Sequence, residues 1–169
     1  MGKATGFLDY ERQDKKAEAP KERISHFREF HKPLTEEEQK KQGARCMACG
    51  VPFCQSGMTL AGMVSGCPLH NLIPEWNDLI YRGAVREAFE RLIKTAPFPE
   101  FTGHVCPALC VKACMLAPTD GGAANRDTEL YLIETAYKNG WMKPPKEKSI
   151  CTKISPPKRQ RKKQNKKKS

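Results

Sequence analysis

The chain has 169 residues, of which 38% are hydrophobic and 29% are charged, and its formal net charge at pH 7 is +11. The length suits one domain with a modest core, and the low hydrophobic fraction indicates that something besides side-chain burial helps to hold the fold together. The charge does not indicate a basic, nucleic-acid-binding domain, because residues 146–169 carry eleven of the 30 basic residues against one acid.

No segment has the features of a targeting sequence or a membrane span. The first residues, MGKATGFLDYERQ, lack the apolar stretch of a signal peptide and the Ser or Thr at position 6 that N-myristoylation needs. There is no run of 18 apolar residues. We therefore expect a cytoplasmic protein with no membrane partner, in a reducing compartment where clustered cysteines favour metal or redox chemistry over disulfides.

The polar amino-terminal segment leads into the first clear helix. Residues 1–33 are predicted to be an extended arm with one short helix around 23–30. Thr35 and Glu38 have the spacing of a capping box, in which each side chain satisfies a backbone amide of the other residue. The helix that they begin is predicted to end at Cys46.

A glycine-rich insertion separates this helix from two further helices. We expect the apolar side chains of residues 55–66, QSGMTLAGMVSG, to pack locally, and a small contact surface is the alternative. Pro74 suits the first turn of a helix over 74–81, which Gly83 can end. A second helix follows over 84–96. The apolar positions of the two helices form a core stripe of helical period: Trp76, Leu79, Ile80, Val85, Ala88, Phe89, Leu92 and Ile93.

The remaining segments are predicted to be a turn and two helices. PFPEFTG (97–103) is typical of a turn, and PALCVKACML (107–116) predicts a short helix. The last helix is expected over 126–139, ended by Gly140. It places three residues on one face: Leu130, Ile133 and Tyr137.

No segment has a strand pattern, so the predicted fold class is all-α, with short helices folded around the cysteines. We expect three parts in the chain. The arm covers 1–33, the helical domain covers 34–145, and residues 146–169 form a disordered lysine-rich tail without an apolar period.

Seven of the eight cysteines lie in a compact pattern, C-x2-C-x4-C, then x12, C-P, x38 and C-P-x2-C-x3-C. Structural zinc sites need four ligands and commonly use two C-x2-C pairs, but only Cys46 and Cys49 form one. His70 and His104 are near the cysteines in sequence, although a lone histidine is usually a surface or structural residue. Disulfides or inert thiols are a further alternative.

Iron–sulfur clusters fit the spacing better. Closely spaced cysteines bind one face of a cubane, and a remote cysteine followed by proline closes another cluster in two-cluster ferredoxins. If their segment is helical, Cys106, Cys110 and Cys114 lie at i, i+4 and i+8 and span about 12 Å of helix axis. That length is too great for one cubane and suits a helix that bridges two clusters.

Three stretches carry a resemblance to a known family: RCMACGVPFCQSG, GCPLHNLIPEWNDLIYRG and FPEFTGHVCPALCVKAC. With these the chain resembles the N-terminal iron–sulfur domain of the small (beta) subunit of NADPH-dependent glutamate synthase, which is similar to the amino-terminal part of dihydropyrimidine dehydrogenase. The resemblance covers residues 1–145 and implies an α-helical ferredoxin-like fold with two [4Fe–4S] clusters.

The resemblance also implies the ligands of each cluster. Cluster 1 is expected to be bound by Cys46, Cys49, Cys54 and Cys114. Cluster 2 is expected to be bound by Cys67, Cys106, Cys110 and Glu129, where the family allows a non-cysteine ligand. Cys151 is the alternative eighth ligand. Glu129 could instead be a first-turn acid that stabilises the helix dipole.

In the family, this domain precedes FAD- and NADPH-binding folds and passes electrons to the flavin of the glutamate-forming large subunit. The dinucleotide-binding motif G-x-G-x-x-G is absent from the 169 residues, so we expect no FAD or NADPH site and no catalysis by this chain alone. The chain is then a truncated or frameshifted product or a free-standing module, with the large subunit or a flavoprotein module as partner. The alternatives are a zinc-binding module whose basic tail binds nucleic acid, a partner that we do not expect, and an inactive fragment.

Overall fold

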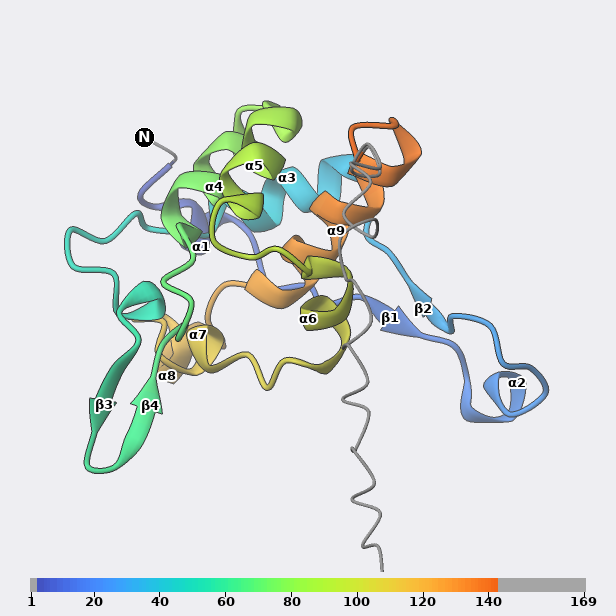
Figure 1. The fold of residues 1–169 in the computed structure, drawn as a ribbon, viewed down its shortest axis with the longest axis horizontal. Coiled ribbons are helices and arrows are strands. Elements are labelled where there is room, and N and C mark those ends of the chain that lie inside the picture. Colours follow the sequence, from blue (N-terminus) through green and yellow to red (C-terminus); the bar gives the residue numbers. More distant parts are fainter. Residues whose placement is uncertain (1–2, 143–169) are drawn as a thin grey trace, which may run out of the picture.

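The computed structural model describes residues 3–142 as a helix-rich body from which two small hairpins project (Figure 1). The body contains the longer helices: α3 (Glu36–Ala44), α4 (Ile73–Tyr81), α5 (Val85–Ile93), α6 (Pro99–Val105) and α9 (Asn125–Lys138). Shorter helices lie in the connections: α1 (Gly6–Asp9), α2 (Pro20–Arg23), the 3-10 helix η1 (Phe53–Gln55), α7 (Leu109–Lys112) and α8 (Ala117–Asp120). The prediction of a helix-rich fold is confirmed.

The core lies where the longer helices pack in sequence, α3 on α4, α4 on α5, and α5 and α6 on α9. The predicted stripe of α4 and α5 supplies most of it. Trp76, Ile80, Ala88, Phe89 and Leu92 are buried, and their helical spacing gathers them on the inner face of each helix. The other three residues of that stripe are partly buried at its edge: Leu79, Val85 and Ile93.

Helix α3 begins as predicted and is held close to α4. The Thr35 hydroxyl accepts a hydrogen bond from the Glu38 amide, and the Glu38 carboxylate accepts one from the Thr35 amide, which completes the capping box. At the other end, Gly43 lies against α4. A Cβ at Gly43 would lie 2.8 Å from the Asn77 carbonyl oxygen, so the two helices approach backbone to backbone. This crossing fixes the end of α3, from which Cys46 follows.

The two hairpins contradict the expectation that no segment forms a strand. Strands β1 (Lys16–Ala17) and β2 (His31–Lys32) pair antiparallel in the arm, and β3 (Met58–Leu60) pairs antiparallel with β4 (Met63–Ser65). Ala61 and Gly62 both have positive φ, as the turn of a two-residue hairpin requires. Positive φ is uncommon at alanine, which is why the sequence pattern did not indicate this turn.

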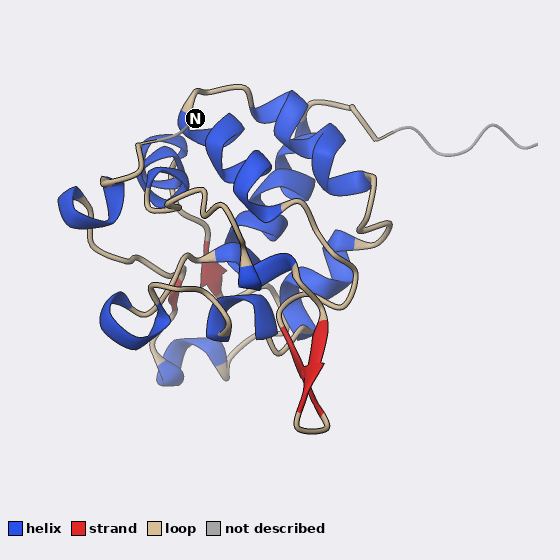
Figure 2. Cartoon of the chain, turned by 90° about the vertical axis from the view of Figure 1, so that its left-hand side faces the viewer, coloured by secondary structure: helices blue, strands red, loops and turns tan. Residues whose placement is uncertain are grey.

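The β3–β4 hairpin projects from the body (Figure 2). Four of its large apolar residues are exposed, Met63 at 72%: Met58, Leu60, Met63 and Val64. The interpretation that residues 55–66 pack locally is therefore wrong. At the base of the hairpin, the Cys67 amide donates to the Cys54 carbonyl oxygen over 2.7 Å.

Three helix boundaries differ from the sequence predictions. The described part of the arm contains two short helices, α1 and α2, and α2 ends at Arg23, where the expected helix of 23–30 would begin. Residues 97–103 are not a turn, because Pro99 opens α6 at a position where a missing amide costs nothing. The helix expected over 107–116 shortens to the four residues of α7. Cys106 and Cys114 therefore lie outside α7, and the predicted i, i+4, i+8 stripe of cysteines is wrong.

Helix α9 matches its prediction closely. It ends at Lys138, and Gly140 follows with positive φ, so the amides of Gly140 and Trp141 bond back to Tyr137 and Ala136. Ile133 is buried and Leu130 packs beside it, but Tyr137 is 50% exposed and does not belong to the core face. In the described part of the chain, no helix has the length and apolar character that crossing a membrane demands.

The lysine-rich tail of 146–169 and Cys151 lie outside the described residues.

Candidate iron–sulfur site

Cys46, Cys49, Cys54 and Cys114 lie around one small hollow, although they come from three parts of the chain. Cys46 and Cys49 lie in the segment that follows α3, Cys54 is in η1, and Cys114 follows α7. Apolar side chains complete the wall: Met47, Pro52, Phe53, Pro74, Met115 and Leu116. The hollow therefore presents four thiols in a largely apolar setting.

A second group joins Cys67, Cys106, Cys110 and Glu129. Burial raises the pKa of the Cys110 thiol to about 12, and the charges of Glu129, Cys67 and Cys106 raise it further. The pKa of Cys67 is raised by burial and also by Glu129 and Cys106. Asn71 links two members of this group, because its backbone amide bonds to the Cys67 thiol and its side chain donates to Glu129 Oε1. Cys67 and Cys110 also lie in one buried cluster.

The two groups are near one another. Burial raises the pKa of Cys54 to about 12, and the neighbouring thiols of Cys46, Cys114 and Cys110 add to the effect. Cys110 belongs to the second group, and Cys54, Cys67 and Cys110 share one buried apolar cluster with Trp76.

Backbone amides donate to the sulfurs in the same way in both groups. Ala108 adopts positive φ, and its amide donates to the Cys106 sulfur over 3.4 Å. Ala48 also adopts positive φ, and its amide lowers the pKa of Cys46, against the larger effect of burial that raises it to about 11. In each case the residue two positions after the cysteine turns its amide back to the thiol. Hydrogen bonds of this kind stabilise a thiolate and tune a bound cluster.

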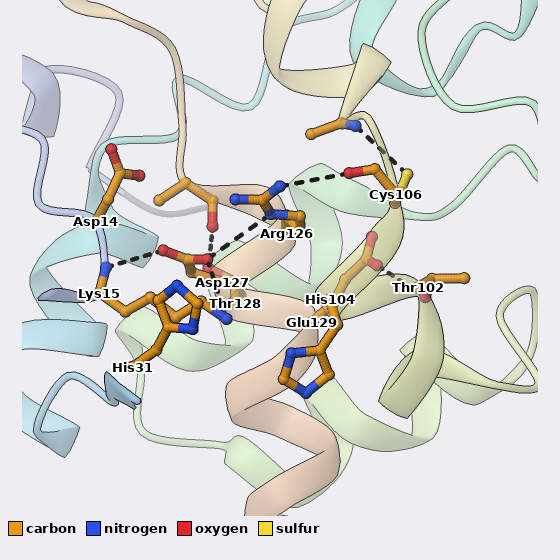
Figure 3. A network of polar contacts seen from close by, with 12 residues as sticks. Asp14, Lys15, His31, Thr102, His104, Cys106, Arg126, Asp127, Thr128 and Glu129 are labelled. Carbon is orange, nitrogen blue, oxygen red and sulfur yellow. Dashed lines mark hydrogen bonds and ion pairs between the residues drawn. The ribbon is translucent and has the colours of Figure 1, made fainter. Parts of the chain in front are cut away.

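Glu129 is a buried acid held at both of its oxygens. It is 6% exposed, Asn71 donates to Oε1 over 3.3 Å, and Thr102 donates to Oε2 over 3.5 Å. Burial raises the pKa of the Glu129 carboxyl to about 7, although both hydrogen bonds lower it. Figure 3 shows Glu129 reaching from α9 toward Thr102 and Cys106. A buried carboxylate of this kind requires a positive partner to stay ionised, and iron would supply one.

Two buried side-chain nitrogen atoms near the cysteines have no hydrogen-bond partner among the described residues: Arg45 Nε and Trp76 Nε1. The side chain of Asn125 is also buried, and its hydrogen bond to Cys110 lowers the pKa of that thiol. A buried donor without an acceptor costs about 1–3 kcal/mol. Thiolate and sulfide sulfurs are acceptors, so the donors fit clusters bound at these positions.

The arrangement suits a cluster better than a single metal ion. Within residues 3–142, no three His, Cys, Asp or Glu side chains form a group that could hold one ion. Four thiolates around one zinc ion stand close together because each Zn–S bond is only about 2.3 Å. A cubane places its ligands at separate iron atoms and so needs them farther apart. The residues present therefore fit a [4Fe–4S] group, which would supply one-electron chemistry when bound.

The two histidines near the cysteines in sequence have other partners. His70 Nδ1 lies 3.1 Å from the Gln55 carbonyl oxygen, and His104 pairs with Glu29. His104 lines a larger hollow of about 470 Å³ between the arm and α9, whose polar floor is the Lys15–Asp127 pair (Figure 3). None of the predicted ligands lines that hollow.

Sequence reasoning missed the polar residues that support the ligands. Asn71 bridges Glu129 and Thr95, whose hydroxyl donates to Asn71 Oδ1 over 2.7 Å. Arg45 is 2% exposed although it carries a charge. Asn71 follows Cys67 by four residues and Arg45 directly precedes Cys46, so closeness to a cysteine was the only available signal.

The comparisons with known proteins identify a family of iron–sulfur domains. Residues 23–141 match the family model described as dihydropyrimidine dehydrogenase domain II, 4Fe-4S cluster. The match covers more than half of the chain, so the chain belongs to this family of iron–sulfur domains, and its predicted resemblance is confirmed.

The relatives are glutamate synthases. The chain is 50% identical over 144 residues to the glutamate synthase [NADPH] small chain of Bacillus subtilis. The aligned segment is 85% of this chain and 29% of that protein. The chain is 34% identical to the small chain of Escherichia coli, over 80% of this chain and 27% of that one. It is 39% identical to the glutamate synthase [NADH] of Saccharomyces cerevisiae, over 84% of this chain and 6% of that protein. The chain thus spans less than a third of each relative.

Proposed function

We propose that this chain is an electron-transfer domain that binds two [4Fe–4S] clusters. Cys46, Cys49, Cys54 and Cys114 would bind cluster 1. Cluster 2 would be bound by the second group: Cys67, Cys106, Cys110 and Glu129. The observation that carries the proposal is the sorting of eight donors, from segments up to 83 positions apart, into two neighbouring groups of four.

The α-helical ferredoxin-like domain would cover 34–145, after an arm of 1–33 and before the lysine-rich tail of 146–169. Its partner would be the large subunit of a glutamate synthase or a flavoprotein module, and its compartment the cytoplasm, where thiols stay reduced. The names of the relatives support the first partner. One-electron relay would run from an NADPH- and FAD-binding module through the two clusters to the glutamate-forming subunit.

The test is the iron content and spectrum of the chain purified without oxygen. The proposal expects about eight iron atoms and eight sulfides per chain, and a broad absorption band near roughly 400 nm that bleaches on reduction. A colourless protein that contains zinc would overturn it. Four irons per chain would leave one cluster and remove the proposed relay between two.

The eighth ligand is tested by comparing three variants by iron per chain. Glu129→Ala should lose about four irons and keep the all-cysteine cluster. Glu134→Ala, an exposed acid on the same helix, is the matched control and should keep eight. If Cys151→Ser loses a cluster while Glu129→Ala keeps both, then Cys151 is the ligand and the assignment of Glu129 is wrong.

A further inference from the structure

Arg45 places a positive charge inside the protein beside cluster 1. It caps the carboxyl end of α3 and directly precedes Cys46. The side chain is buried at 2% exposure, and its two terminal nitrogens donate to the backbone carbonyl oxygens of Tyr10 and Asp120. These contacts connect the arm, α3 and the end of α8 around one guanidinium group.

The charge is held by carbonyl oxygens rather than by a direct ion pair. In the described range of 3–142, no carboxylate forms an ion pair with Arg45, and its Nε hydrogen has no acceptor. A guanidinium group stays protonated in proteins. Burial lowers the pKa of Arg45, and the Asp120 carboxylate acts in the opposite direction. Carbonyl dipoles alone are a poor replacement for water around a buried cation.

Arg45 lies next to the proposed ligands of cluster 1. Cys46 is its neighbour in the chain, and Arg45 donates to Asp120 at the end of α8, whose first residue, Ala117, donates its amide to the Cys114 carbonyl oxygen. A [4Fe–4S] centre bound by four thiolates is negative and becomes more negative when it accepts an electron. A fixed positive charge in a medium of low dielectric constant therefore stabilises the reduced form more than the oxidised form.

We infer that Arg45 raises the reduction potential of cluster 1 and so favours the arrival of electrons there. The inference rests on the proposed function, because it presupposes the two clusters. It adds a tuning residue that is not itself a ligand. The role differs from that of a helix-capping residue, which would affect stability and leave the potential unchanged.

The experiment is a potentiometric titration of the purified chain, reduced with dithionite and followed by electron paramagnetic resonance. The signal of cluster 2 is assigned as the one that Glu129→Ala alters. Arg45→Gln removes the charge and Arg45→Lys retains it. Arg86→Gln removes an exposed charge that pairs with Glu90 on α5 and is the matched control. All variants are compared at equal iron content.

Arg45→Gln should lower the reduction potential of cluster 1 by at least about 59 mV, which is a tenfold change in the equilibrium constant for one-electron reduction. Arg45→Lys should shift it by less than half as much, and Arg86→Gln should not shift it. Loss of cluster 1 from Arg45→Gln but not from Arg45→Lys would also support a role for the charge. An unshifted potential in loaded Arg45→Gln, or equal loss of iron from both Arg45 variants, would overturn the inference. A parent chain without clusters would instead refute the proposed function.

Discussion

Replacing Asn71 with alanine should release cluster 2 and leave cluster 1 in place. The Asn71 amide donates to Glu129 Oε1 over 3.3 Å and accepts from the Thr95 hydroxyl over 2.7 Å, all at a buried site. Hydrogen bonds to charged groups contribute about 1.5–3 kcal/mol, which is roughly a 10- to 150-fold change in an equilibrium. The loss of a residue that hydrogen-bonds to a metal ligand typically lowers the affinity for the metal about 10- to 100-fold.

The assay follows the transfer of iron to a chelator, with the absorbance of the two clusters resolved by their rates. In Asn71→Ala, the iron of cluster 1 should leave at the same rate as in the parent chain. The iron of cluster 2 should leave at least about ten times faster than in the parent chain. Asn139→Ala is the control, because Asn139 donates to the Thr135 carbonyl oxygen at an exposed site. Equal acceleration of both halves would show that Asn71 supports the fold as a whole. Unchanged rates would show that it does not support Glu129.

Three further predictions concern the fold around the ligands. Gly43→Ala should lower the free energy of unfolding by about 1–2 kcal/mol in urea titrations, since overpacking against the Asn77 carbonyl oxygen (about 1–3 kcal/mol) outweighs the gain in helix propensity. Gly50→Ala, where the added methyl group meets open space, should change it little, and a stabilised Gly43→Ala would refute the reasoning. Ala48 has positive φ, which glycine adopts easily and a β-branched residue does not. Ala48→Gly should therefore be neutral or stabilise the chain by up to about 1 kcal/mol, and Ala48→Val should destabilise it. Thermal melts of the loaded chain test both variants. Removal of iron by chelation should leave residues 46–115 with poorly dispersed amide signals in NMR spectra, because metal-site formation is part of the folding free energy; sharp, dispersed signals with reduced cysteines would contradict this.

The helices that pack by periodic apolar residues could be predicted from the sequence. Ala88, Phe89 and Leu92 recur at helical spacing in α5 and are buried as expected. The capping box of Thr35 and Glu38 and the glycine after α9 are local signals whose geometry depends on a few neighbouring residues.

Segments governed by tertiary contacts could not be predicted in this way. Helix α6 has the proline and glycine content of a turn, yet Gly103 lets it lie against α9, where a Cβ would come within 2.9 Å of the Leu130 Cβ. The helix expected from Pro107 does not begin there, because Ala108 has positive φ and its amide donates to the Cys106 sulfur. Cys106 is accordingly extended.

The candidate site was predictable in its cysteines and not in its surroundings. The cysteine spacing pointed to clusters without any knowledge of the fold, because ligand spacing in a loop is a local property. Asn71, Thr102 and Arg45 contact the site only after distant segments meet. The grouping of Cys114 with Cys46 likewise depends on where α7 ends, which the sequence pattern misplaced.

The hydrogen bond at the base of the β3–β4 hairpin has a consequence for assembly. It joins Cys54 of the first group directly to Cys67 of the second, and Gly66 allows the close approach because a Cβ there would lie 2.3 Å from the Phe53 carbonyl oxygen. In the proposed two-cluster protein, filling either group would fix its own cysteine of this pair and, through the bond, order the cysteine of the other group. The conformational entropy that this part of the chain loses when the first cluster binds therefore need not be lost again when the second cluster binds. Cells short of iron would then contain full and empty chains, with few half-filled ones.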